Sequence, residues 1–391
     1  MAGYIFNLDN INSLEKYIKN GVYATKLSPP KNNQWRTHHE ATLADYITMK
    51  EGDNVYFFID RKIYGIGSLI NLKNDCKFSN FPDACKPENY DENNDYKNKK
   101  ELLLWDEGEF SINQRWLCIF KPEPYFFTTG IDMDEVLTSK PSAFRMLRAF
   151  WKVSFIKIDD EENQALKDII LKINEKVIAN PILDKNVFTS HYKETHKNIL
   201  NKLQSDNYNI NIYDVLDFCS NGEDKNFLRH EMALELGVLY QLSILDKETC
   251  KIFGEWDYLS HQVIASPFKP IDYMDKMDIF GYSYITGYSP TRSKYLIIEL
   301  KKDKAKIEDV DQLLKYVDWV KDEYCYGNYS MISAYLIAYE FSDDVINYKE
   351  QYGNRKYTIG RRPAKSFEWN NLKLIKYLYD YNNKKIIFNN I

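Results

Sequence analysis

The sequence predicts an α/β (α+β) protein of two domains, and three observations support that prediction. The chain has 391 residues, which is more than one hydrophobic core usually organises. Its N-terminal half carries mainly strand patterns, whereas its C-terminal part combines strand patterns with helical ones. Hydrophobic residues make up 44% of the chain and aromatic residues 15%, which excludes a disordered protein. We expect domains at 1–178 and 226–391, joined by a connector at 179–225.

The N-terminal domain is expected to be rich in strands. The alternating segment Asn54–Ile59 follows the turn Glu51-Gly52-Asp53, and Ile63–Ile70 is its expected hairpin partner. A polar stretch from Asn74 to Lys100 predicts a long loop inside this domain. Further along the chain we expect a strand at Arg115–Phe120, a short helix at Ala143–Arg148, a strand at Trp151–Ile158 and a helix at Glu161–Ile178.

The connector shows one helical piece, at about Thr195–Leu203, and a second α/β region begins near Phe227. The patterns of this region predict the order helix, three strands, helix and strand. These six elements are expected at Phe227–Leu242, Leu259–Ser266, Lys276–Tyr282, Tyr295–Leu300, Ile307–Glu323 and Met331–Tyr339.

Charge and cysteine usage narrow the possible functions. With 52 basic and 57 acidic residues the net charge is −5, so binding to a phosphate backbone would need a local basic face. The six cysteines form no CxxC pair and have no histidine at zinc-ligand spacing, which argues against a zinc site and favours the reducing cytoplasm. Neither a signal-peptide pattern nor a long apolar run occurs, so we expect no membrane partner.

The most informative residues are Asp278, Glu299 and Lys301. Side chains alternate between the two faces of a strand, so Glu299 and Lys301 in Tyr295–Lys301 point to the same side. Asp278 lies on the preceding strand, and the turn Gly287-Tyr288-Ser289-Pro290 predicts a hairpin of the two strands. Two carboxylates and an ammonium group are therefore expected to meet at one point of a sheet.

That combination suits hydrolysis of a phosphodiester bond. Asp278 and Glu299, with the carbonyl group of Leu300, can hold one Mg²⁺, with Mn²⁺ as a substitute, and leave positions for water and a phosphate oxygen. The ion polarises the phosphate and lowers the pKa of a bound water. Lys301 is expected to orient or deprotonate that water, or to stabilise charge on phosphorus. The structural alternative is that charged residues at the exit of an apolar strand are merely solvated.

Two helices can complete this site. Gln312 and Tyr316 are four residues apart and share one helix face, which could present an amide and a phenol to the phosphate. Glu231 and Glu235 have the same spacing on the helix before the sheet, where a solvated helix face is an equally good interpretation. We expect one of these two glutamates, preferably Glu231, to serve the site.

Residues from about Phe227 to Tyr339 resemble the nuclease domain of the PD-(D/E)xK superfamily, and most closely its NucS branch. The matching positions are Glu231, Asp278 before Ile279-Phe280-Gly281, Glu299-Leu300-Lys301 and the segment Val310–Val317. The resemblance implies a restriction-endonuclease-like αβββαβ core, with metal bound by Asp278 and Glu299, Lys301 catalytic, and Glu231, Gln312 and Tyr316 lining the site. It also implies a homo-oligomer. Lys276-Met277 precedes Asp278 where the motif often has a proline, and that position varies in the superfamily.

Residues Asn20–Ile158 resemble a PUA-like β-barrel domain of the EVE or YTH kind. The resemblance is carried by Gly21–Ala24, Trp35, Glu51–Phe57, Tyr64–Gly67 and Arg115-Trp116. It implies that this domain reads nucleic acid, including a modified or flipped base. Trp35, Trp105 and Trp116 could supply faces for base stacking, although a tryptophan in a small barrel is more often part of the core.

Five cations cluster near the C-terminus, and no acid occurs between Gln351 and Lys365. They are Arg355, Lys356, Arg361, Arg362 and Lys365. This cluster is expected either to contact phosphates or to be a solvated loop. The motifs predict a Mg²⁺-dependent DNA endonuclease, and the two resemblances together imply a role in restriction or phage defence, with RNA not excluded as a partner. The alternatives are a DNA-repair or structure-specific nuclease, and an inert nucleic-acid-binding module.

Overall fold

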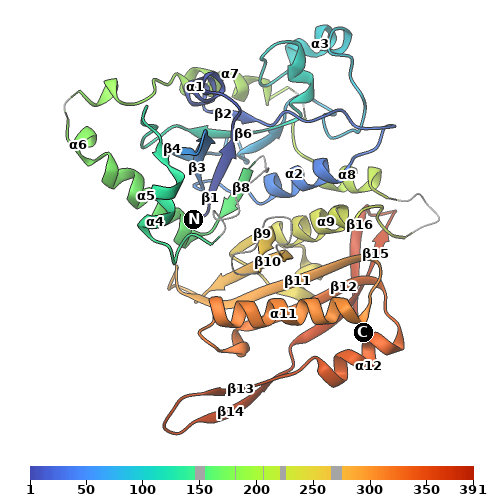
Figure 1. Cartoon of the computed structure of the whole chain (residues 1–391). Helices are drawn as coiled ribbons and strands as arrows, with labels where there is room; N and C mark the ends of the chain where they lie inside the picture. The colour runs from blue at the N-terminus through green and yellow to red at the C-terminus, as the bar shows by residue number, and fades with distance from the viewer. Residues whose placement is uncertain (146–154, 181, 206, 221–225, 266–274) are drawn as a thin grey trace. The chain divides into compact units, whose positions relative to one another are not determined.

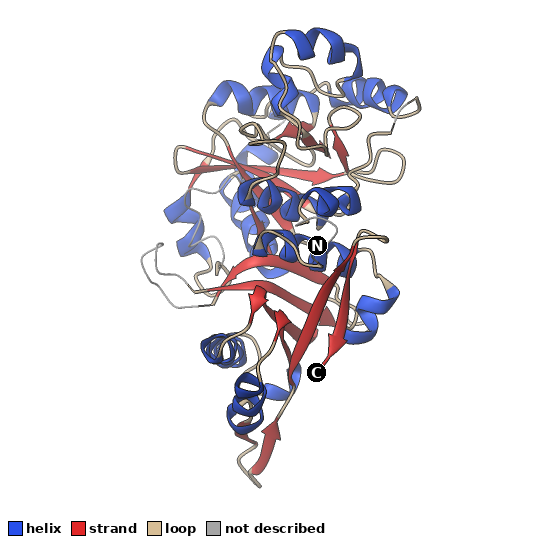
Figure 2. Ribbon diagram, turned by 90° about the vertical axis from the view of Figure 1, so that its right-hand side faces the viewer, coloured by secondary structure: helices blue, strands red, loops and turns tan. Residues whose placement is uncertain are grey.

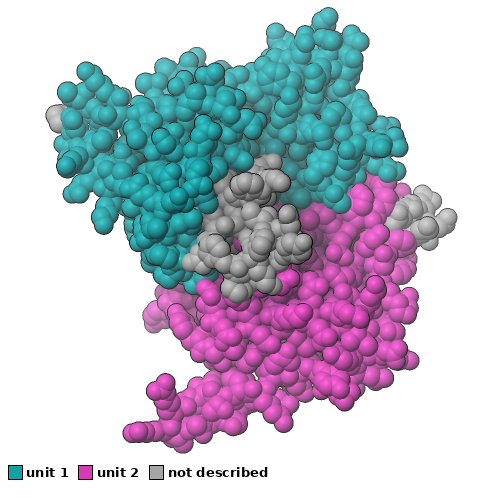
Figure 3. All heavy atoms as spheres, in the orientation of Figure 1, with its two compact units in different colours: residues 1–211 teal, residues 212–391 magenta. Residues whose placement is uncertain are grey.

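The computed structural model describes residues 1–145, 155–180, 182–205, 207–220, 226–265 and 275–391. The chain divides into two compact units, Met1–Asn211 and Ile212–Ile391, coloured separately in Figure 3. The segment predicted as a connector is therefore shared between the units. Its helix α7 (Tyr192–Lys202) belongs to unit 1, whereas α8 (Ile212–Phe218) belongs to unit 2. No described helix is both long and apolar enough to cross a membrane.

Within its described residues, unit 1 is built around a mixed sheet with the strand order β2-β6-β4-β3-β1-β8, in which β5 also pairs with β6 and β7 with β4. The bounds are β1 Gly3–Asn7, β2 Val22–Ala24, β3 Asn54–Ile59, β4 Lys62–Leu69, β5 Lys77–Ser79, β6 Trp116–Lys121, β7 Ile131–Asp132 and β8 Phe155–Ile158. The predicted hairpin of β3 and β4 is confirmed. Its turn residues Asp60 and Arg61 both have left-handed backbones, as a tight hairpin turn requires.

The helices of unit 1 surround this sheet (Figure 1). They are α1 Ile11–Asn20, α2 Thr37–Ile47, α3 Asn94–Lys99, α4 Met133–Ser139, α5 Asp160–Ile173, α6 Glu175–Ile178 and α7. The helix predicted at Glu161–Ile178 is confirmed as α5 and α6, and Asp159 caps its start by accepting from the N–H of Glu162. The expected helix at Ala143–Arg148 and the start of the strand expected at Trp151–Ile158 extend into residues 146–154, which lie outside the described residues.

One prediction for unit 1 is wrong. The polar stretch from Asn74 to Lys100, predicted as a loop, contains β5 and α3. Strand β5 forms because its backbone pairs with β6, and Phe78 of this strand is buried. A pairing partner distant in sequence overrides the weak local strand pattern.

Unit 2 contains a six-stranded sheet in its described residues, with the order β16-β15-β12-β11-β10-β9. The bounds are β9 Tyr258–Ile264, β10 Lys276–Tyr284, β11 Arg292–Lys304, β12 Ile332–Glu340, β15 Leu372–Asp380 and β16 Lys385–Asn390. Strand β12 is parallel to β11 and to β15, and the other pairs are antiparallel. Figure 2 shows the twist of this sheet. A separate two-stranded ribbon joins β13 (Arg355–Ile359) and β14 (Lys365–Trp369).

The predicted order of helix, three strands, helix and strand is confirmed in unit 2. Helix α9 spans Glu231–Ser243 and α11 spans Ile307–Glu323, the latter with the bounds that its periodicity predicts. Both helices contact β11, whose residues from Tyr295 to Leu300 are all buried. Asp309 supports the start of α11, because its carboxylate accepts from the N–H of Lys306 at 2.8 Å. Helix α12 covers Asp343–Tyr352.

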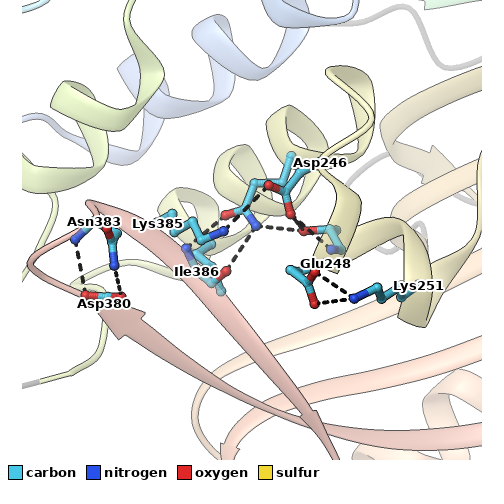
Figure 4. A network of polar contacts seen from close by, with 9 residues as sticks. Asp246, Glu248, Lys251, Asp380, Asn383, Lys385 and Ile386 are labelled. Atoms are coloured by element: carbon cyan, nitrogen blue, oxygen red, sulfur yellow. Dashed lines mark hydrogen bonds and ion pairs between the residues drawn. The ribbon is translucent and has the colours of Figure 1, made fainter.

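Helix α10 (Lys247–Phe253) was not predicted. Asp246 caps it, since the carboxylate accepts from the N–H of Thr249 at 3.0 Å. Lys385 of β16 lies 3.6 Å from the same carboxylate, and Glu248 pairs with Lys251 along the helix (Figure 4). These contacts attach a short helix to the edge of the sheet.

Candidate active site

Strand pairing brings Asp278 and Glu299 together. In the antiparallel pair of β10 and β11, Ile279 lies opposite Ile298, and the two carboxylates stand one position further along. The N–H of Leu300 donates to Asp278 Oδ2 at 2.8 Å. Asp278 is 9% exposed and Glu299 only 1%. The two acids therefore occupy neighbouring strands in a largely buried place, as the hairpin pattern predicts.

Lys301 completes this group from the same face of β11. Its Nζ lies 2.7 Å from Glu299 Oε1, and 3.9 Å from both Glu231 Oε1 and Asp309 Oδ1. Burial acts to lower the pKa of Lys301, but the adjacent Glu299 carboxylate outweighs it and the pKa lies above its usual value. An amine with a raised pKa remains an ammonium ion at neutral pH. The contact with Glu299 thus holds Lys301 in its charged form.

Both central carboxyl groups have raised pKa values. Burial raises the pKa of Glu299 to about 7 against the opposing effect of Lys301, and the acids Glu231 and Asp309 add to the increase. Burial also raises the pKa of Asp278, and the neighbouring Glu299 raises it further. Two close carboxylates withdrawn from water favour the uptake of a positive charge.

The oxygens available here fit a hard divalent cation. Among the described residues, Glu299 Oε2 is buried and has no hydrogen-bond partner. Carboxylate and carbonyl oxygens are the ligands that Mg²⁺ takes, usually from one or two carboxylates with water completing the shell. The described part of the chain holds no group of three or more His, Cys, Asp or Glu side chains arranged around a metal position. Of the residues here, Asp278, Glu299 and the carbonyl group of Leu300 are the ones that could hold such an ion.

Helix α11 directs Gln312 and Tyr316 toward the same place. Gln312 Nε2 donates to the Tyr316 hydroxyl at 2.7 Å. Tyr316 is buried, and burial followed by the charge of Glu299 raises the pKa of its phenol above the usual value. The phenol therefore stays protonated and able to donate.

The two glutamates of α9 contact different parts of the site. Glu231 is half-exposed near Lys301, and burial raises the pKa of its carboxyl group although Lys301 opposes this. Glu235 is buried, and its carboxylate contacts His261 Nδ1 at 2.9 Å and Gln262 Nε2 at 3.0 Å. Gln262 Nε2 also lies 3.3 Å from Asp278 Oδ1. Both glutamates face the central acids, so neither is only a solvated side chain.

The sequence patterns did not single out His261, Gln262 and Asp309. Asp309 is three residues before Gln312 on α11, and this spacing could have identified it. Strand β9 positions His261 and Gln262, and their placement depends on its register against β10. Gln262 also has a left-handed backbone with φ of 52°, a conformation that costs a residue with a side chain about 1 kcal/mol.

The proposed base-stacking residues of unit 1 are buried. Trp35, Trp105 and Trp116 all belong to the core, and Trp35 Nε1 donates to the carbonyl oxygen of Cys85 at 3.2 Å. Trp35 and Trp116 also contact each other, with ring centroids 5.6 Å apart. This burial favours a role in the hydrophobic core, and not in base stacking, for all three rings.

The basic cluster near the C-terminus lies on β13, β14 and their connection. Arg361 and Arg362 are exposed in the connection. Arg355 instead forms an ion pair with Asp318 of α11, with Nε 3.0 Å from Oδ1. The three arginines therefore divide into one anchoring residue and two exposed cations.

Comparisons with known proteins match only part of the chain. No protein-family model matches it, and no curated protein does either. One similar solved structure is the crystal structure of a repair endonuclease from Pyrococcus abyssi, at 23% identity over 29% of this chain and 42% of that chain, with a TM-score of 0.18. Another is the structure of an EndoMS–dsDNA2 complex, at 18% identity over 25% of this chain and 34% of that chain, also with a TM-score of 0.18. The chain spans less than half the length of either, so a function has to follow from the side chains of the site.

Proposed function

We propose that unit 2 is a metal-dependent endonuclease of the PD-(D/E)xK type that hydrolyses phosphodiester bonds in DNA. The observation that carries this proposal is the arrangement of Asp278, Glu299 and Lys301. Two buried carboxylates lie side by side, one with an unpartnered oxygen, next to an ammonium group on the same strand face. A structural ion pair alone does not explain the second buried acid.

Asp278 and Glu299, with the carbonyl group of Leu300, would hold Mg²⁺, and Mn²⁺ would substitute. When bound, the ion would polarise the phosphate and lower the pKa of a water molecule. Lys301, held as an ammonium ion by Glu299, would stabilise negative charge that develops on the phosphate oxygens.

The surrounding side chains orient the reacting groups. The amide of Gln312 and the phenol of Tyr316 would donate hydrogen bonds to the phosphate. Glu231 would restrain Lys301, and Glu235 would position Asp278 through Gln262. These roles need side chains held by neighbouring contacts, as they are here.

Unit 1 would act as a PUA-like domain that senses features of the DNA such as modified bases, in restriction or phage defence. In this proposal Trp35, Trp105 and Trp116 support the fold, because their rings are buried. A role in DNA repair, on mismatched or branched duplexes or on ends, is compatible with the same chemistry in unit 2. Cleavage of both strands would suit a homo-oligomer.

The test is cleavage of plasmid and linear DNA with Mg²⁺ or Mn²⁺ by the wild type and by Asp278→Ala, Glu299→Ala and Lys301→Ala. We expect each substitution to abolish cleavage. Cleavage that persists in all three variants would remove the assignment. Defence is then distinguished from repair by cleavage of matched duplexes that are unmodified, methylated, hydroxymethylated, mismatched or branched. Only a sensor of modified bases cleaves the methylated or hydroxymethylated duplex at a rate different from that of the unmodified one.

A further inference from the structure

Residues 355–369, here called the arm, form a ribbon that projects from the rest of unit 2. Figure 1 shows β13 and β14 extending away from the six-stranded sheet, and the arm is also visible as a projection in Figure 3. The arm carries five cations, Arg355, Lys356, Arg361, Arg362 and Lys365, against the single acid Glu368. A locally basic surface on a chain of net charge −5 suggests a polyanionic partner.

The base of the arm is anchored on both strands. The Arg355 guanidinium group contacts both carboxylate oxygens of Asp318, with Nε 3.0 Å from Oδ1 and Nη2 3.2 Å from Oδ2. On the other strand, Trp369 is buried and its Nε1 donates to the carbonyl oxygen of Ile332 at 2.9 Å. Asp318 belongs to α11, the helix that also lines the candidate active site. The base of the arm is therefore held by the same helix that lines the candidate active site.

One face of the arm carries three apolar side chains beside Lys365. Tyr357 lies opposite Phe367 and Ile359 lies opposite Lys365, so the three apolar side chains share a face. Phe367 is 44% exposed and Ile359 is 40% exposed, whereas the ring of Tyr357 packs 5.6 Å from that of Phe367. An exposed apolar stripe bordered by cations is a feature of surfaces that bind a partner.

We propose that the arm enters the major groove of duplex DNA, with Arg361 and Arg362 on phosphates and Phe367 and Ile359 against base edges. The major groove of B-form DNA admits a two-stranded ribbon, and apolar side chains contact thymine methyl groups there. The deep and narrow major groove of A-form RNA does not admit one. This inference rests on the proposed function, because it places the DNA substrate against unit 2.

The experiment measures binding by the full-length protein in EDTA, where no cleavage is expected. The probes are a labelled DNA duplex, the single strand of the same sequence and the matching RNA duplex, each titrated at several salt concentrations. The variants are Arg361→Ala/Arg362→Ala and Phe367→Thr, which keeps a residue that favours strands. The matched control is Lys247→Ala/Lys294→Ala, which removes two exposed cations outside the arm.

We expect the double arginine variant to make the plot of log binding constant against log salt concentration less steep, by about the slope that two phosphate contacts contribute. The lysine control should leave this slope unchanged. Phe367→Thr should weaken binding to the DNA duplex roughly five- to tenfold with an unchanged salt dependence, because it removes an apolar contact. It should leave binding to the RNA duplex unchanged.

Wild-type duplex affinity in both arm variants would overturn the proposal. An equal loss on all three probes after Phe367→Thr would also overturn it, because the contact would not depend on a groove. If the arm variants instead change the oligomeric state in sedimentation, the arm is an interface between copies of this chain. Failure of the nuclease assignment is distinct, since it appears as cleavage that survives Asp278→Ala, Glu299→Ala and Lys301→Ala, whereas the binding measurements in EDTA do not depend on cleavage.

Discussion

The two units bury charged groups in different ways. In unit 1 the guanidinium group of Arg115 is buried and donates to three backbone carbonyl oxygens, those of Ala84 at 3.3 Å, Lys86 at 2.8 Å, and Glu88. Burial lowers its pKa only to about 10, so the charge is retained. Lys157, also buried, donates to a backbone carbonyl in the same manner. Charges satisfied by the backbone stabilise a fold because their removal would leave buried carbonyl groups unpaired.

In unit 2 the buried charges are like charges. Asp278 and Glu299 lie on neighbouring strands, and Glu299 Oε2 has no partner among the described residues. Such an arrangement costs folding free energy and is expected where a ligand supplies the missing charge. The comparison teaches that burial alone does not identify a functional group. The close pairing of two buried acids on neighbouring strands is the more specific sign.

The largest expected effect is on Glu299. Replacing it with glutamine keeps the shape of the side chain but removes one of the two negative charges. Cleavage should fall roughly 10²–10³-fold, because one of the two carboxylate charges that would hold the divalent ion is lost. The melting temperature should stay equal or rise, because a buried like charge disappears. Plasmid cleavage and thermal unfolding measure the two effects. A strongly destabilised variant would show instead that Glu299 serves as the structural partner of Lys301.

The next effect concerns Arg115. Replacing it with methionine fills similar space but leaves three buried carbonyl groups without donors, so we expect a loss of about 3 kcal/mol in the free energy of unfolding. Cleavage per folded molecule should be unchanged. Denaturant unfolding compares this variant with Lys31→Met, which changes an exposed cation of the same unit. Equal stability of the two variants would contradict the contrast between the units.

The sequence predicted most of unit 2 because its elements are long and regular. Strands β10 and β11 are long, mostly apolar runs, and α11 repeats apolar residues from Val310 to Val320 at helical spacing. The turn between the two strands, with side chains that alternate between the faces of a strand, was enough to place Asp278 beside Glu299. Short elements such as α10, β5 and α3 were missed, because contacts distant in sequence decide their conformation.

Two features of the site could not be predicted from the sequence. The contact between Glu235 and Gln262 depends on how β9 lies beside α9, which no local pattern encodes. The left-handed backbone of Gln262 is not indicated by its residue type, because glutamine rarely adopts it. In unit 1, the choice between exposed and buried tryptophans depended on packing, which composition does not determine.

A smaller effect is expected in the pH dependence of stability, which tests the buried, hydrogen-bonded groups of unit 1. His39 is buried, its Nδ1 accepts from the N–H of Arg36 at 3.2 Å, and its Nε2 contacts the carbonyl oxygen of Ser28 at 2.7 Å. This neutral tautomer has no site for a second proton. Burial lowers the pKa of His39 to about 4 against the effect of the Ser28 carbonyl, and the charges of His38 and Arg115 lower it further.

The unfolded chain therefore takes up a proton near pH 6.5 that the native chain refuses until about pH 4. Stability should be complete above that window and fall by about 2 kcal/mol as the pH drops through it. His39→Gln, which retains a donor and an acceptor, should reduce this decline in denaturant unfolding measured from pH 7 to pH 4. A decline of the same size in both proteins would assign it to other groups.

The smallest effect returns to the buried acids of unit 2 and concerns Gln262. Its amide lies between Glu235 and Asp278, on a strained backbone. Gln262→Gly relieves the strain but removes the amide, so stability should hold while the Mg²⁺ concentration for half-maximal cleavage rises about tenfold. Calorimetry of Mg²⁺ binding should show the same weakening without DNA. Gln262→Asn tolerates the left-handed backbone and keeps a shorter amide, so it should recover part of the affinity. If the Gln262→Gly and Gln262→Asn variants both bind Mg²⁺ as tightly as the wild type does, the amide of Gln262 only fills space and the two acids need no positioning group.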